Sequence, residues 1–141
     1  MVVDDDTRIR ALVVRLIRSC GFDATIEAAD GREALAYLEK HDPDLILTDM
    51  DMPGMGGIEM VRRLRADGIR TPVIMMSAQD DEAVIAQAHK SGISAYLRKP
   101  VNGVMLARMI HRTLAVAERM SKRPGGKARD HRDHRGRRGV A

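Results

Sequence analysis

The sequence predicts a doubly wound α/β domain built on a parallel sheet. Short apolar runs of strand length alternate five times with segments whose apolar residues follow helical spacing. The run at 45–48 is nearly all apolar, which is typical of a strand buried on both faces. Strict alternation of this kind implies right-handed crossovers, with helices on both faces of the sheet. A chain of 141 residues is long enough to form one such domain with a substantial core.

Five strands are expected from apolar runs bounded by glycine, proline or polar residues. The first is very short, because only Met1, Val2 and Val3 precede an acidic pair. The second follows a Cys-Gly stop, and the fourth begins at a proline. In chain order, the expected strands are residues 2–3, 22–28, 45–48, 72–76 and 94–97.

Five helices are expected from apolar residues three and four positions apart, together with residues that cap or stop a helix. Asp6 is expected to cap the first of them. In chain order, they are a helix marked by residues 9–17 and stopped by Cys20-Gly21, a helix from Asp30-Gly31 to just before Pro43, a helix marked by residues 58–64 and stopped by Gly68, a helix at 80–90, and a helix from its cap Asn102 to about Arg119.

The net charge of +4 is unevenly distributed along the chain. From Lys122 to the end there are eight Lys or Arg and two Asp, a net charge of +6. The first 121 residues hold sixteen basic and eighteen acidic side chains, a net charge of −2. The sequence therefore divides into a folded domain at 1–120 and a basic tail at 121–141. We expect the tail to be disordered, because it has almost no apolar residues to bury.

Composition and sequence patterns indicate where in the cell the protein is located. No apolar run approaches the roughly 18 residues of a membrane span, and the N-terminus lacks the order of a secretory signal. The chain has one cysteine, Cys20, which lies in the apolar pattern of the first helix and is expected to pack as a small hydrophobic residue. These features favour a cytoplasmic protein.

Polar residues follow the ends of four expected strands. The acidic pair Asp4-Asp5 follows the first strand, Asp49 the third, Ser77 the fourth and Lys99 the fifth. The carboxyl ends of parallel strands meet at one edge of the sheet, where doubly wound folds bind their ligands. Carboxylates grouped there with a hydroxyl and an ammonium predict a site for a divalent cation and a phosphoryl group.

Five motifs in this order resemble the receiver domains of two-component response regulators, over residues 2 to about 120. The residues that separate Asp5, Asp49, Ser77 and Lys99 also match receiver spacing. The resemblance implies a flavodoxin-like, five-stranded parallel sheet in the order 2-1-3-4-5, in a stand-alone protein similar to chemotaxis receivers. The motifs are Val-Val-Asp-Asp-Asp at 2–6, Leu-Ile-Leu-Thr-Asp-Met-Asp-Met-Pro at 45–53, Gly-Ile-Glu at 57–59, Pro-Val-Ile-Met-Met-Ser-Ala at 72–78, and Ala-Tyr-Leu-Arg-Lys-Pro at 95–100.

The resemblance also implies a role for each acidic residue. Asp49 takes a phosphoryl group from a phosphohistidine on a sensor histidine kinase or a histidine phosphotransfer protein. Asp5 and Asp49 ligate Mg²⁺ (or Mn²⁺) directly, the backbone carbonyl of Asp51 gives a third ligand, and Asp4 acts through water. The protein is then a phosphoacceptor with its own phosphorylation chemistry rather than a conventional enzyme.

The remaining implied roles concern switching. Lys99 pairs with Asp49 before transfer and with a phosphoryl oxygen afterwards, and a cis bond is expected between Lys99 and Pro100. Ser77 hydrogen-bonds another phosphoryl oxygen, and Tyr96 turns inward when Ser77 moves. A protein target would then bind the face formed by the fourth helix, fifth strand and fifth helix.

Parts of the sequence are also compatible with other functions. A phosphoryl relay or sink, and a fragment of a larger response regulator, fit the same motifs. The pair Asp49 and Asp51 also suggests a phosphatase of the haloacid dehalogenase type, but that family carries its motif on the first strand and has no proline at the place of Pro53. The basic tail suggests nucleic-acid binding, but it contains no aromatic residues for stacking and no zinc-ligand spacing.

Two features favour plain structural explanations. The methionines at 50, 52, 55 and 60 are expected to pack around the site rather than to bind a soft metal. The very short first strand would make a central strand unusually weak, so we expect that the natural protein begins several residues upstream of Met1.

Overall fold

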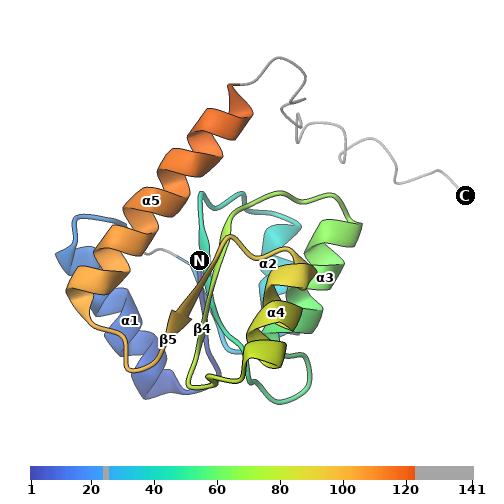
Figure 1. Ribbon diagram of the computed structural model, residues 1–141, viewed down its shortest axis with the longest axis horizontal. Helices are drawn as coiled ribbons and strands as arrows, with labels where there is room; N and C mark the ends of the chain where they lie inside the picture. Colours follow the sequence, from blue (N-terminus) through green and yellow to red (C-terminus); the bar gives the residue numbers. More distant parts are fainter. Residues whose placement is uncertain (24–25, 123–141) are drawn as a thin grey trace, which may run out of the picture.

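The computed structural model describes residues 1–23 and 26–122. Its sheet has five parallel strands in the order β2-β1-β3-β4-β5 (Figure 1). This order confirms the predicted doubly wound, flavodoxin-like fold. The strands are β1 (Val2–Val3), β2 (Glu27–Ala28), β3 (Ile46–Asp49), β4 (Val73–Ser77) and β5 (Ala95–Arg98).

Helices cover both faces of this sheet. In Figure 1, α1 and α5 lie on one side of the strands, and α2, α3 and α4 lie on the other. This is the three-layer arrangement that right-handed crossovers produce. The helices are α1 (Thr7–Ser19), α2 (Gly31–Leu38), α3 (Gly57–Ala66), α4 (Glu82–Ser91) and α5 (Gly103–Ser121).

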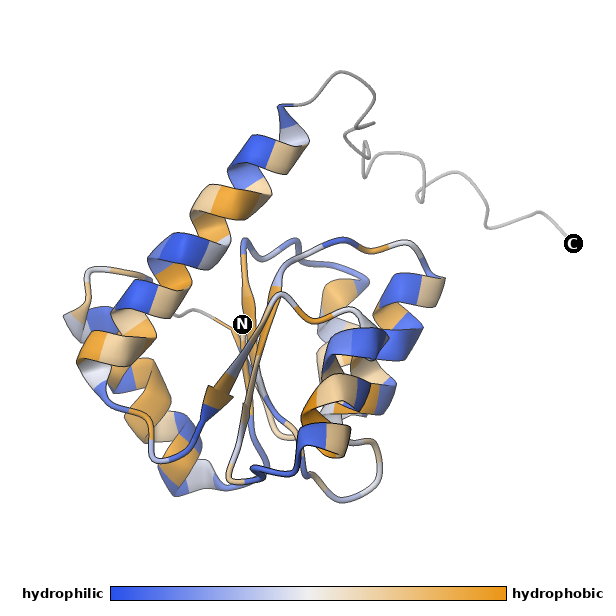
Figure 2. Ribbon diagram, viewed as in Figure 1, coloured by the Kyte–Doolittle hydropathy of each residue, from blue (hydrophilic) through white to orange (hydrophobic). Residues whose placement is uncertain are grey.

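The sheet separates two apolar cores, because successive strand residues point to opposite faces. Val2, Ile74 and Met76 pack beneath α1 and α5, whereas Val3 and Met75 pack beneath the other three helices. Figure 2 shows apolar residues along the central strands, whereas apolar and hydrophilic residues alternate along the helices. The four methionines near the site are buried in the second of these cores, which confirms that they act in packing.

Two of the predicted helix caps are confirmed by hydrogen bonds. The Asp6 side chain accepts from the backbone N–H groups of Arg8 and Ile9 at the start of α1. The Asn102 side chain accepts from the N–H of Met105 at the start of α5. Both side chains occupy N–H groups that have no partner within the helix.

The strand predicted at 22–28 was wrong in length, because among its described residues only Glu27 and Ala28 form β2. Its single neighbour is β1, which is itself only two residues long, so a longer ladder has nothing to pair with. The short first strand was predicted correctly. The pairing extends one step further at Met1, whose carbonyl accepts from Leu47 N at 2.9 Å and whose amino group donates to the Leu45 carbonyl at 2.8 Å.

The last helix runs to Ser121, slightly beyond its predicted end near Arg119. Figure 1 shows the second half of α5 extending past the rest of the domain. The predicted disordered tail lies, from residue 123 onward, outside the described residues. Within the described part of the chain, none of the helices combines the length and apolar character needed to cross a bilayer.

Candidate functional site

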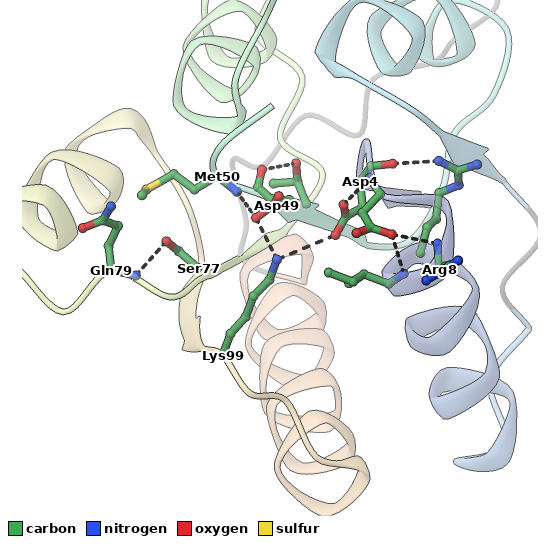
Figure 3. A network of polar contacts seen from close by, with 11 residues as sticks. Asp4, Arg8, Asp49, Met50, Ser77, Gln79 and Lys99 are labelled. Carbon is green, nitrogen blue, oxygen red and sulfur yellow. Dashed lines mark hydrogen bonds and ion pairs between the residues drawn. The ribbon is translucent and has the colours of Figure 1, made fainter. Parts of the chain in front are cut away.

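The predicted polar residues gather at the carboxyl edge of the sheet. Asp49 and Ser77 are the last residues of β3 and β4. Asp4 follows β1 directly, and Lys99 follows β5. Figure 3 shows the side chains of Asp4, Asp49 and Lys99 pointing toward one another, with Ser77 beside them. The topology therefore brings together residues that are up to 95 positions apart in the chain.

Asp49 is nearly buried, and one of its carboxylate oxygens is already engaged. Its Oδ1 accepts a hydrogen bond from Met50 N at 2.9 Å and another from Lys99 Nζ at 3.1 Å. Its Oδ2 accepts none from the residues that the structure describes. The backbone holds the carboxylate in place from one side and leaves an oxygen available on the other.

Asp4 is fully buried, although aspartate side chains are charged at neutral pH in most proteins. Its Oδ1 accepts from Asp6 N at 2.9 Å, while its buried Oδ2 has no hydrogen-bond partner among the described residues. The nearest cation is Lys99 Nζ, 3.8 Å from Oδ2, which is beyond hydrogen-bond reach. Burial, reinforced by the neighbouring charges of Asp49 and Asp5, raises the pKa of Asp4, against the opposing hydrogen bond from Asp6 and the charge of Lys99.

Asp5 completes an acidic cluster and differs from Asp4 in being exposed. One carboxylate oxygen from each of Asp4, Asp5 and Asp49 lies within 4.8 Å of the others. With the single ammonium of Lys99, the three carboxylates leave two uncompensated negative charges. This donor set fits Mg²⁺, which prefers oxygen ligands, and a divalent cation would supply the missing charge near Asp4 Oδ2, which accepts no hydrogen bond from the described residues.

Asp51 lies in the exposed part of the loop that leads from β3 to α3. This loop borders an open cavity of about 370 Å³, lined by Met50, Asp51, Met52, Pro53 and Gly56. The role of the Asp51 carbonyl as a metal ligand stays a prediction.

Ser77 and Tyr96 are both tied to the loop that follows β4. The Ser77 hydroxyl oxygen accepts from Gln79 N at 3.1 Å. The Tyr96 hydroxyl donates to the Gln79 carbonyl at 2.9 Å, so the two residues hold the same peptide segment from opposite sides. The predicted cis bond between Lys99 and Pro100 is confirmed.

Two contributors to the site were missed by sequence reasoning. Gln79 links Ser77 to Tyr96 through its backbone N–H and carbonyl. Because almost every residue type has these groups, the sequence gives no sign of this link. Arg10 donates from Nη1 to the Asp4 carbonyl at 2.7 Å and from Nε to Glu27 at 3.3 Å. Its place on the polar side of α1, one turn after the acidic pair, was the available signal.

Comparison with known proteins decides the family. Residues 1–111 match the response regulator receiver domain. The chain belongs to this family. It is 39% identical to chemotaxis protein CheY-3 of Vibrio cholerae over 75% of this chain and 83% of that protein. It is 36% identical to chemotaxis protein CheY of Pseudomonas aeruginosa, over 79% of this receiver and 92% of the relative.

Solved structures agree with this assignment. A CheY-like receiver domain protein from Methanospirillum hungatei superposes with a TM-score of 0.77 at 28% identity, over 84% of this chain and 94% of that one. The receiver domain of Francisella response regulator 1452 gives 0.77 at 34% identity, over 82% and 95%. The DNA-binding response regulator MtrA of Mycobacterium tuberculosis is 37% identical over 71% of this chain but only 43% of its own length. The same domain thus also occurs within longer proteins.

Proposed function

We propose that Asp49 accepts a phosphoryl group from the phosphohistidine of a sensor histidine kinase or a histidine phosphotransfer protein. The observation that carries this proposal is the contact of Lys99 Nζ with Asp49 Oδ1 at 3.1 Å, beside a buried Asp4 oxygen that lacks a hydrogen bond. An anchored carboxylate, an ammonium and unbalanced negative charge together form a site suited to phosphoryl transfer. The proposed setting is the cytoplasm, and the protein acts as a signalling phosphoacceptor rather than a conventional enzyme.

The transfer step balances without a further reactant. The free Oδ2 of Asp49 attacks phosphorus, an O–P bond forms, and the P–N bond of the phosphohistidine breaks. The electron pair of the broken bond stays on the departing imidazole. Met50 N and Lys99 hold Oδ1, so the carboxylate keeps its orientation during the attack.

The metal in this proposal is Mg²⁺ (or Mn²⁺), held by Asp5, Asp49 and the carbonyl of Asp51, with Asp4 acting through water. When bound, it supplies the positive charge that lets an anionic carboxylate and a phosphoryl group approach each other. Arg10 holds the backbone of Asp4 at 2.7 Å and so keeps the acidic pair at the edge of the sheet.

Output would follow from the loop that Ser77 and Tyr96 share. A phosphoryl oxygen accepts the Ser77 hydroxyl hydrogen and draws Ser77 away from Gln79 N, and the lysine moves its contact to another phosphoryl oxygen. Because Tyr96 holds the Gln79 carbonyl, a shift of this loop reaches β5 directly. The proposed readout is a protein target that binds the α4-β5-α5 face.

The test is labelling by radioactive acetyl phosphate in the presence of Mg²⁺. We expect Asp49→Asn to abolish labelling, because an amide does not attack phosphorus, and EDTA to do the same to the unaltered protein. Asp51→Asn is the matched control: it removes an exposed carboxylate two residues away, keeps the backbone carbonyl, and should leave labelling in place. Full labelling of Asp49→Asn would show that another residue is the acceptor.

Coupling is tested with Lys99→Ala and Ser77→Ala. Both should still accept some phosphate, but their amide-exchange patterns should match those of the unlabelled protein. A normal phosphorylation-dependent change in both variants would contradict the switch. A panel of phosphorylated histidine kinases, scored for rapid transfer to Asp49, would then identify the donor.

A further inference from the structure

The layer formed by α1 and α5 has a charge opposite to that of the rest of the domain. The two helices together carry seven arginines and one acidic residue, Glu118. The other residues among the first 121 carry nine basic and seventeen acidic side chains. A net charge of +6 on two neighbouring helices, against −8 elsewhere, gives one side of the molecule a strong positive potential.

Exposed apolar side chains interrupt this positive layer. Leu12 of α1 is 51% exposed, and Val104 of α5 is 65% exposed. Met105, Val116 and Met120 add further exposed apolar surface along α5. Of the six large apolar side chains most exposed in the described part of the chain, five lie on these two helices. Val104 and Met105 are adjacent at the start of α5, and exposed apolar surface beside basic residues is typical of a binding surface.

A groove lies where the end of α1 meets the beginning of α5. Its volume is about 1020 Å³, and it is lined by Ser19 and Cys20 from one helix and by residues such as Val104, Ala107, Arg108 and Arg112 from the other. None of its lining residues is acidic. Arg108 and Arg112 form no ion pair with any residue that the structure describes, so their charges are available to a ligand.

We infer that this groove, with the exposed arginines beside it, binds an acidic amphipathic helix of a partner protein. An amphipathic helix lays its apolar side in a groove, and its acidic side chains would meet Arg108 and Arg112 at the rim. Duplex nucleic acid offers little apolar surface to contact Val104 and Met105, which line the groove beside the two arginines. Residues 123–141 of this chain are excluded as the occupant, because they carry seven basic and two acidic side chains.

This binding would not depend on phosphorylation. The groove lies on the α1-α5 side of the sheet, between the end of α1 and the first half of α5. Tyr96 packs against the core on the opposite face of the sheet. The groove therefore serves as an attachment point that is separate from the switching loop.

The probe is a fluorescein-labelled peptide of about 18 residues, with Leu at helical core spacing and Glu on the opposite side. Binding is followed by fluorescence polarisation at about 0.05 M and about 0.3 M salt. Arg108→Glu combined with Arg112→Glu should weaken binding by at least about tenfold. The matched control is Arg32→Glu combined with Arg62→Glu, which makes the same charge change at exposed positions of α2 and α3 and should leave affinity within about twofold.

Additional measurements in the same assay test which kind of partner occupies the groove. A peptide with Lys in place of Glu should not bind, and a higher salt concentration should weaken binding of the Glu peptide. Protein labelled at Asp49 and Asp49→Asn protein should bind it equally well. If the charge-reversed pair fails to fold, by circular dichroism, Arg108→Gln combined with Arg112→Gln gives the same test with a smaller change.

Three results would overturn the inference. One is equal affinity for the Glu peptide with and without the two arginines. Another is tighter, arginine-dependent binding to phosphatidylglycerol vesicles or to duplex DNA than to the peptide, which would assign the surface to a lipid or nucleic-acid partner. The third is affinity that follows phosphorylation, which would show that the groove is coupled to the switch rather than separate from it. Peptide binding by a chain that fails to accept phosphate would refute the proposed function and leave this inference standing.

Discussion

The two edges of the sheet differ in how they satisfy a charged side chain, half-buried Arg65 at one edge and fully buried Asp4 at the other. At the edge away from the site, the guanidinium of Arg65 donates to the carbonyls of Ile69 at 2.7 Å, Thr71 at 2.9 Å and Gly92 at 2.9 and 3.1 Å. At the site edge, Asp4 is more deeply buried, and its Oδ2 has no hydrogen-bond donor among the described residues.

Only one of these two charges is satisfied by the fold itself. Arg65 joins the end of α3 to the segments that lead into β4 and β5, and its charge is satisfied by the fold alone. Burial, reinforced by the charge of Arg70, lowers the pKa of Arg65. Burial raises the pKa of Asp4, and there the fold supplies too few partners. An unsatisfied buried carboxylate lowers stability, so its presence at the site edge is consistent with a cation that binds there.

Removing Arg65 should have the largest effect on stability. Arg65→Ala leaves three carbonyls without their donor, and we expect a loss of about 3 kcal/mol in the free energy of unfolding. Arg65→Lys should recover only part of it, because one ammonium does not reproduce the planar fork. Urea unfolding measures both. Arg62→Ala, an exposed change on the same helix, is the control and should cost less than about 0.5 kcal/mol. Equal losses at the two positions would break the comparison.

Removing the charge of Asp4 should have the opposite effect on stability, because it should raise the free energy of unfolding. In metal-free protein at pH 7, Asp4→Asn should stabilise the fold by about 1–2 kcal/mol, because an uncompensated buried charge disappears. The raised pKa means that the folded state holds this proton to higher pH than the unfolded chain does. The penalty in the unaltered protein is therefore absent below about pH 4, grows as the pH rises through the raised pKa, and is complete above it.

The measurement is urea unfolding in EDTA at pH 7 and near pH 4. The gain from Asp4→Asn should be largest at pH 7 and should disappear near pH 4. A destabilised Asp4→Asn protein at pH 7 would show that the ion pair with Lys99, at 3.8 Å, compensates the charge of Asp4 after all.

Mg²⁺ should compensate the charge of Asp4 and so reduce the difference between the two edges of the sheet. A ligand that binds only the folded state at about ten times its dissociation constant stabilises it by about 1.4 kcal/mol. We expect Mg²⁺ to raise the thermal midpoint of the unaltered protein and to raise that of Asp4→Asn and Asp5→Asn less. Arg65→Lys serves as the control, since its defect lies far from the acidic cluster and its response to Mg²⁺ should be unchanged. An equal response in all four proteins would show that Mg²⁺ does not bind at this site.

The contrast also explains what the sequence could predict. Apolar runs and their alternation identified the strand ends, and a parallel sheet brings those ends to one edge, so Asp49, Ser77 and Lys99 were placed together correctly. The greater burial of Asp4 relative to Asp5 was not predictable from two adjacent identical residues. Asp4 N still pairs with the Ala28 carbonyl at 3.1 Å, so the sheet orients Asp4, while Asp5 lies beyond the ladder.

Arg65 was missed altogether for a related reason. Its acceptors are backbone carbonyls, one of them 27 positions away at Gly92. Such contacts depend on loop paths and have no pattern of side-chain types. Sequence reasoning therefore found the edge where polar side chains gather and overlooked the edge where an arginine binds backbone carbonyls.

The smallest effect is expected from Tyr96→Phe, which removes the hydroxyl that donates to the Gln79 carbonyl at 2.9 Å. This bond is partly exposed, so its loss should cost less than about 1 kcal/mol in the free energy of unfolding. Its local effect should be larger, because the loop after β4 then keeps only the bond from Gln79 N to Ser77 and the exposed ion pair of Asp80 with Arg98, both at 3.1 Å. Amide exchange at residues 78–81 should become faster, while exchange in β4 stays unchanged. The phenyl ring remains in its packing position, so a general loss of protection would indicate a core defect. Unchanged exchange in the loop would show that Tyr96 does not restrain it, and the proposed link from Ser77 to β5 would need a different carrier.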